Sequence, residues 1–142
     1  MAQVHDNIIA AYHVDFENER LVLKTQFYYD GKLRENTDVV FTGYFTHLFG
    51  NEHKGSVIFD IEEREPIHFY EREHELIEEN RRYCWPINYQ TPETKAELLG
   101  FLQKNEYKVF EISSSYGLCG WVLAKQMEII ATEVEANDTR EL

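Results

Sequence analysis

The amino-acid sequence predicts an α+β domain in which a mostly antiparallel sheet of about six strands carries two helices packed on one face. Segments near both ends alternate apolar and polar side chains, whereas helical spacing is confined to the middle of the chain. No repeat or linker interrupts the 142 residues. Residues 1–142 are therefore expected to form a single domain with the element order ββββααββ.

The first two strands are predicted from strict alternation. In residues 8–16 every second position is apolar, from Ile8 to Phe16, and the alternation resumes over residues 20–29. The polar residues 17–19 separate the two runs, which are therefore expected to form a hairpin.

The next two strands follow a polar connection that begins at Asp30-Gly31 and extends through Thr37. Residues 39–49 predict the third strand, in which Gly43 marks a bulge or a close backbone approach. Residues 56–61 are rich in β-branched and aromatic side chains and predict the fourth strand.

Helical spacing predicts two helices in the middle of the chain. Pro66 suits the first turn of a helix, and apolar residues recur at helical intervals as far as Cys84, before Trp85-Pro86. A capping threonine, a first-turn proline and an early acid open the second helix, over residues 91–105.

The last two strands are predicted over residues 107–113 and 121–130, and the polar tail from about residue 133 is expected to fray. Between these strands, Cys119 is flanked by glycine-containing sequence. A nucleophile elbow requires a glycine two residues after the nucleophile and a helix beyond it. Here the glycine follows the cysteine directly and a strand pattern comes next, so we interpret the segment as a hairpin connection with a small buried thiol.

Charge and composition exclude several classes of partner. The chain carries 26 acidic and 14 basic residues, a net charge of −12, whereas nucleic-acid binding needs clustered lysine and arginine. No apolar run approaches the roughly 20 residues of a membrane span, and no signal peptide is evident. We expect a cytoplasmic protein with reduced cysteines and neither a nucleic-acid nor a membrane partner; its oligomeric state stays open.

Sequence motifs predict no catalytic residue, cofactor or metal. Glycine-rich phosphate motifs, GxSxG, HExxH and CxxC are all absent. Glu71 and His74 have the spacing of metal ligands on a bundle helix, but the second helix offers no matching motif.

The first helix supplies most of the candidate binding residues. Its solvated face is expected to carry four carboxylates: Glu71, Glu75, Glu78 and Glu79. Glu73 and Asn80 instead fall inside the apolar arc of the helical wheel. Either the helix is slightly rotated and leaves Glu73 at the boundary, or Glu73 is aimed at a groove between helix and sheet.

His47 is the candidate on the third strand, because it lies an even number of residues from Phe41, Phe45 and Phe49 and should therefore share their face of the strand. A histidine on such a face is more often a hydrogen-bonded core residue or strand-end residue than a ligand. Tyr44, nearby, is expected to be an exposed aromatic.

The run SVIFDIEE, a charged helix ending in YCWP, a second capped helix and YKVFEISSSYGLCGWVL follow one another along the chain. Over residues 39–124 this layout resembles small acidic single-domain bacterial families, some of them immunity partners in toxin systems. The resemblance implies an acidic domain without catalytic residues, and no functional residue is carried over from it.

Three functions follow as hypotheses. The first is a non-enzymatic acidic domain that binds a basic protein, such as a toxin it neutralises, through the four carboxylates with Tyr44 as an anchor. The second is a small-molecule pocket between sheet and helices, with His47 and Glu73 at its polar edge. The third is an enzyme of unrecognised type, which needs His47, Asp60 or Glu73 to converge in one cleft.

Overall fold

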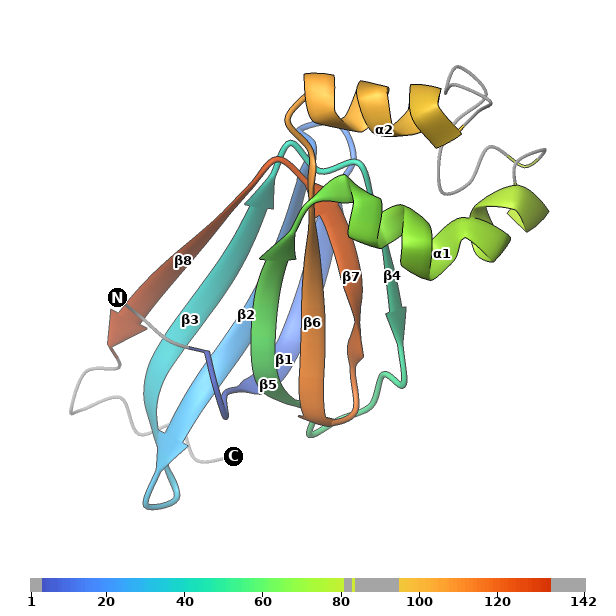
Figure 1. Ribbon diagram of the computed structural model, residues 1–142. Helices are drawn as coiled ribbons and strands as arrows, with labels where there is room; N and C mark the ends of the chain where they lie inside the picture. Colours follow the sequence, from blue (N-terminus) through green and yellow to red (C-terminus); the bar gives the residue numbers. More distant parts are fainter. Residues whose placement is uncertain (1–3, 81–82, 84–94, 134–142) are drawn as a thin grey trace.

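The computed structural model describes residues 4–80, 83 and 95–133 (Figure 1). The element bounds are β1 Ile8–Asp15, β2 Arg20–Tyr29, β3 Lys32–Thr42, β4 Thr46–Gly50, β5 Val57–Arg64, α1 Pro66–Asn80, α2 Lys95–Lys104, β6 Lys108–Tyr116, β7 Cys119–Ala124 and β8 Gln126–Glu133. All strands join one antiparallel sheet in the order β4-β7-β6-β5-β1-β2-β3-β8. The α+β class is confirmed, but the sheet has eight strands rather than about six and the element order is βββββααβββ.

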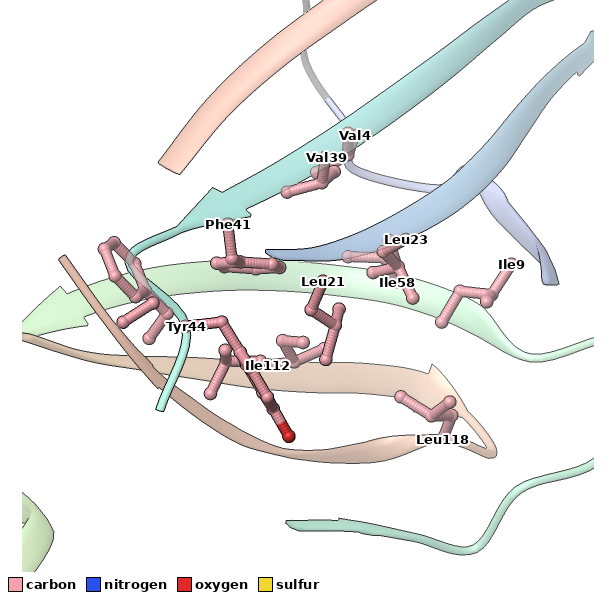
Figure 2. Close-up of a cluster of buried hydrophobic side chains, with 13 residues drawn as sticks. Val4, Ile9, Leu21, Leu23, Val39, Phe41, Tyr44, Ile58, Ile112 and Leu118 are labelled. Atoms are coloured by element: carbon pink, nitrogen blue, oxygen red, sulfur yellow. The ribbon is translucent and has the colours of Figure 1, made fainter. Parts of the chain in front are cut away.

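The sheet folds back on itself at the junction of β1 and β5. A single residue pair, Ile8 and Val57, joins these two strands. The junction divides the sheet into a helix-side half (β4, β7, β6, β5) and an outer half (β1, β2, β3, β8). The inner faces of the two halves enclose the main hydrophobic cluster (Figure 2), in which the ring centroids of Phe41 and Phe110 are 5.4 Å apart.

A second hydrophobic cluster lies between the helices and the other face of β6 and β7. Phe69 of α1 packs edge-on against Trp121 of β7, with ring centroids 4.8 Å apart, and Leu98 and Leu102 of α2 belong to the same cluster. Both helices therefore cover one face of the helix-side half, and Figure 1 shows them gathered at one end of it. Because β6 and β7 are buried on both faces, the fold has three layers: helices, helix-side half and outer half.

Two predicted strands are each divided in the structure, which explains the additional strands. Residues 39–49 belong to β3 and β4, and residues 121–130 belong to β7 and β8. The two breaks lie against each other: the Lys125 N–H donates to the Thr42 carbonyl (3.0 Å) and the Phe45 N–H to the Leu123 carbonyl (2.9 Å). Here the chain crosses twice from one half-sheet to the other, at a single corner.

Gly43 is the residue that permits this corner. Its φ is +63°, and a Cβ at this position would lie 2.6 Å from Cγ of Lys125. The predicted close approach therefore exists, although the side chain of Lys125 makes it rather than a backbone.

The prediction of a polar connection through Thr37 is wrong. Asp30 and Gly31 alone form the turn, with φ values of 55° and 72°, and β3 begins at Lys32. Positive φ at both central residues is the requirement of a type I′ hairpin turn, which Asp-Gly satisfies. The polar side chains after the turn lie in a strand, where the Thr25 hydroxyl donates to the Thr37 carbonyl (2.8 Å).

The segment around Cys119 is a hairpin, as predicted, and Gly117-Leu118 is its turn. Leu118 is the buried residue, and its N–H donates to the Ser56 hydroxyl (2.9 Å). The thiol of Cys119 is only partly buried, contrary to the prediction, because Cys119 lies near an edge where it pairs with Gly50 of β4.

Three of the predicted boundaries concern residues outside the described ranges. The end of the first helix at Cys84, the start of the second at residue 91 and the fraying tail lie wholly or largely outside the described residues. No helix in the described ranges is long and apolar enough to cross a membrane.

Candidate functional site

The carboxylates predicted for the solvated face of α1 are all exposed: Glu71, Glu75, Glu78 and Glu79. Three of them, Glu71, Glu75 and Glu79, are four residues apart and form one row along the helix, here called the carboxylate row. Within the described parts of the chain, no ion pair neutralises any of these three side chains.

Three described cations near α1 pair with carboxylates outside the row. Arg64 pairs with Glu62 (2.8 Å) and Glu111 (3.3 Å). Arg72 pairs with Glu111 (3.6 Å) as well as with Glu73 (3.3 Å). Lys108 of β6 likewise pairs with Glu65, the residue just before α1 (2.8 Å). Among the described residues, these ion pairs leave the carboxylate row without a neutralising partner.

Glu73 lies at the edge of the helix–sheet interface. Its side chain is 15% exposed and pairs with Arg72, while Asn80 donates its side-chain N–H to the Leu76 carbonyl (3.0 Å). This placement matches the interpretation of a boundary residue. The helix–sheet interface beside it is filled by the second hydrophobic cluster.

Tyr44 is not the exposed anchor that the sequence suggested. It is 7% exposed, because its ring belongs to the main hydrophobic cluster (Figure 2). Its hydroxyl lies 2.7 Å from Nδ1 of His47, at the edge of that cluster. The structure thus brings two predicted site residues together, in a partly buried hydrogen bond.

His47 lies on β4 and faces the first strand of the outer half. Its ring contacts Phe49 (centroids 4.8 Å apart) and Tyr12 of β1 (6.0 Å). Phe45, expected on the same face, instead packs against Phe101 and Tyr107 on the helix side, because the chain bends between β3 and β4.

A hydrogen bond joins β1 to the loop after β4, beside the ring contact of Tyr12 with His47. The Tyr12 hydroxyl donates to Oε1 of Glu52. Neither residue was a candidate from the sequence. They are 40 positions apart, and no spacing rule connects a strand tyrosine to a loop glutamate across that distance. The sequence indicated only that Tyr12 lies on the apolar face of its strand.

The surroundings set the protonation of these groups. Hydrogen bonding to the Glu52 carboxylate, together with burial, raises the pKa of Tyr12 to about 12. Burial also raises the pKa of Tyr44 and lowers the pKa of His47, against the opposing charge of Glu52. The Tyr44 hydroxyl donates to Nδ1 of neutral His47 when the imidazole proton is on Nε2, and accepts from Nδ1 in the other tautomer.

The stability of the protein should depend on pH through His47. Because its folded-state pKa is lowered, the unfolded state takes up the proton first as the pH falls. The stability contribution is complete above the ordinary value of about 6.5 and is lost as the pH falls through the lowered value. His47→Gln, which keeps an acceptor for Tyr44, should lose less stability than the wild type between pH 7 and 5 in urea titrations. Equal losses would contradict this assignment.

A groove of about 660 Å³ opens beside Tyr12 and Glu52. One wall is the edge of β1 from Ile8 to Tyr12, and the other is the loop from Glu52 to Ser56. The groove follows the place where β1 and β5 separate after their single pair, and where β1 has a bulge between Ile9 and Ala11. It lies away from the helices, unlike the pocket that the sequence suggested.

The residues required by the enzyme hypothesis are not joined in the described structure. No contact links His47 to Glu73 or to Asp60, whose Oδ1 accepts from the Ile61 N–H (2.9 Å). Among the described residues, no three His, Cys, Asp or Glu side chains are grouped closely enough to hold a metal ion. No family model, curated protein or solved structure matches this chain.

Proposed function

We propose that this chain is a non-enzymatic acidic binding domain whose partner is a basic protein, as in a toxin-neutralising immunity pair. The observation that supports the proposal most directly is the carboxylate row of Glu71, Glu75 and Glu79. It is exposed, it follows one line of a helix and no described cation neutralises it.

The row has an energetic cost in the isolated protein. Like charges at i, i+4 destabilise a helix by about 0.2–0.5 kcal/mol per pair, and the row contains two such pairs. A cationic partner removes this repulsion on binding. The net charge of −12 adds a long-range field that accelerates encounter with that partner.

The layout of α1 also suits recognition by a protein surface. Its buried side is fixed by Phe69 and Ile77 in the second cluster, so the row is presented on a supported helix. Complementary charge of this kind contributes mainly to association rate and to discrimination against acidic competitors.

Neutralising the row tests the proposal. The wild type, immobilised, would be used to isolate partners from lysate of the producing cells at low salt, and the affinity of each purified partner would then be measured. We expect a basic protein whose association with Glu71→Gln/Glu75→Gln/Glu79→Gln is weaker by about tenfold or more at low salt. The difference should shrink as salt rises.

A matched control removes the same charge elsewhere. Glu17→Gln/Asp30→Asn/Glu128→Gln also changes three exposed carboxylates, none of them on α1. This control should retain most of the affinity, and the row variant should unfold at the same or slightly higher denaturant. A partner that is not basic, or one that binds both triple variants equally, would contradict the proposal.

A further inference from the structure

The groove beside Tyr12 is a candidate ligand site independent of α1. Its volume of about 660 Å³ is within the range of small-molecule sites, roughly 300–1,000 Å³. The chain forms it with short side chains: Ala10 and Ala11 are exposed along the β1 wall, while Ile9 and Leu118 are buried beneath. The interior is therefore apolar and accessible.

The polar groups of the groove are unevenly distributed. At one end Glu52 uses Oε1 to accept from Tyr12, which fixes the carboxylate and leaves Oε2 available as an acceptor. Tyr12 and Tyr28 also line the groove, and aromatic faces attract cations. Tyr12 remains a protonated donor over the physiological pH range, so this end is anionic only through Glu52.

Two basic residues belong to the same loop. His53 is held by its Nδ1 against the Lys54 carbonyl (2.8 Å), and the Lys54 side chain is exposed. Because Lys54 lines the same groove as Glu52, its positive charge opposes the binding of cations there. The net charge of −12 acts in the opposite direction and raises the local concentration of small cations.

We propose that this groove binds a small organic cation, an amine with an apolar body. The ammonium group donates to Oε2 of Glu52 beside the Tyr12 ring, and the hydrocarbon lies along Ala10 and Ala11 above Leu118. The inference is separate from the proposed protein partner, because no residue of the groove lies on α1.

Three probes of equal length test the charge preference: hexylammonium, 1-hexanol and hexanoate. Each would be titrated into the 15N-labelled full chain and followed by amide chemical shifts. We expect shifts centred on Ala10, Ala11 and Leu118, and hexylammonium to bind about tenfold more tightly than hexanol, as one charge-assisted hydrogen bond implies. Hexanoate should bind most weakly.

Variants separate the contributions of charge and shape. Glu52→Gln keeps an acceptor for Tyr12 but removes the charge, so hexylammonium and hexanol should then bind alike. Lys54→Gln should tighten hexylammonium by removing this opposing charge. Ala11→Phe should fill the groove and weaken all three probes, with its folding verified by circular dichroism.

The carboxylate-row triple variant serves as the control, because it should bind hexylammonium as the wild type does. Failure of this control would mean that the amine binds to α1 instead. The inference is also overturned if no probe shifts the groove amides at millimolar concentration, if hexanoate binds most tightly, or if Glu52→Gln leaves the preference for hexylammonium intact.

Discussion

Gly120→Ala is expected to destabilise the protein by about 2–6 kcal/mol, since overpacking and a strained backbone each cost about 1–3 kcal/mol. Gly120 has a φ of +150°, and a Cβ there would lie 1.9 Å from the carbonyl oxygen of Leu48. That oxygen belongs to the backbone of β4, so no side-chain rotation relieves the contact. Urea titration gives the change in the free energy of unfolding.

Gly31→Ala is the matched control for this substitution. Gly31 also has a positive φ, +72°, but nothing lies within 4 Å of the position of its added Cβ. Its cost should be limited to the left-handed conformation, about 1–2 kcal/mol. Equal losses for the two variants would show that the contact between β4 and β7 is not tight at Gly120.

Trp121→Ala is expected to cost about 3–5 kcal/mol, a large share of the 5–15 kcal/mol typical of a domain. Trp121 is 1% exposed and lies between β7 and α1, where it meets Phe69. Its removal leaves a cavity, and the two helices and the sheet around it cannot all move inward to fill it. The loss should appear in urea titration and as reduced helical signal in circular dichroism.

Two substitutions bracket the effect. Trp121→Phe keeps an aromatic ring against Phe69 and should lose clearly less stability. Tyr116→Ala, which removes a large side chain that is 68% exposed on the same hairpin, should change stability by no more than about 0.5 kcal/mol. A loss below about 1 kcal/mol for Trp121→Ala would mean that the helices are only loosely attached.

The sequence predicts the elements of this fold better than their connections. Alternation located β1 and β2 to within a residue, because it reports one buried face and needs only local information. The assignment of faces was less accurate. The bulge between Ile9 and Ala11 shifts the register within β1, and Phe16, placed on the apolar side, is 77% exposed.

The strand breaks at the corner could not be predicted from local pattern. Apolar residues continue through Gly43 and through Lys125, so each segment has the pattern of one long strand. The breaks depend on backbone hydrogen bonds between residues about 80 positions apart, which no local period reports. The Asp30-Gly31 turn, by contrast, carried a recognisable two-residue hairpin signal.

In the candidate site, too, features set by local spacing were predicted and features set by contacts between distant residues were not. The exposed carboxylates of α1 were predicted, because helical spacing determines which positions face solvent. Tyr44 and His47 were both selected, but their hydrogen bond depends on the bend after Gly43. Glu52 was missed because its role comes from a strand 40 residues earlier.

The corner also constrains how the protein forms during synthesis. β4 pairs only with β7, and β8 covers the last edge of β3. β7 lies between β4 and β6 in the sheet. A growing chain of about 115 residues, which lacks β7, therefore leaves β4 without a neighbouring strand and one edge of β6 unpaired. We expect the nascent polypeptide to stay protease-sensitive on the ribosome until residues 119–133 emerge, and then to acquire resistance in one late step.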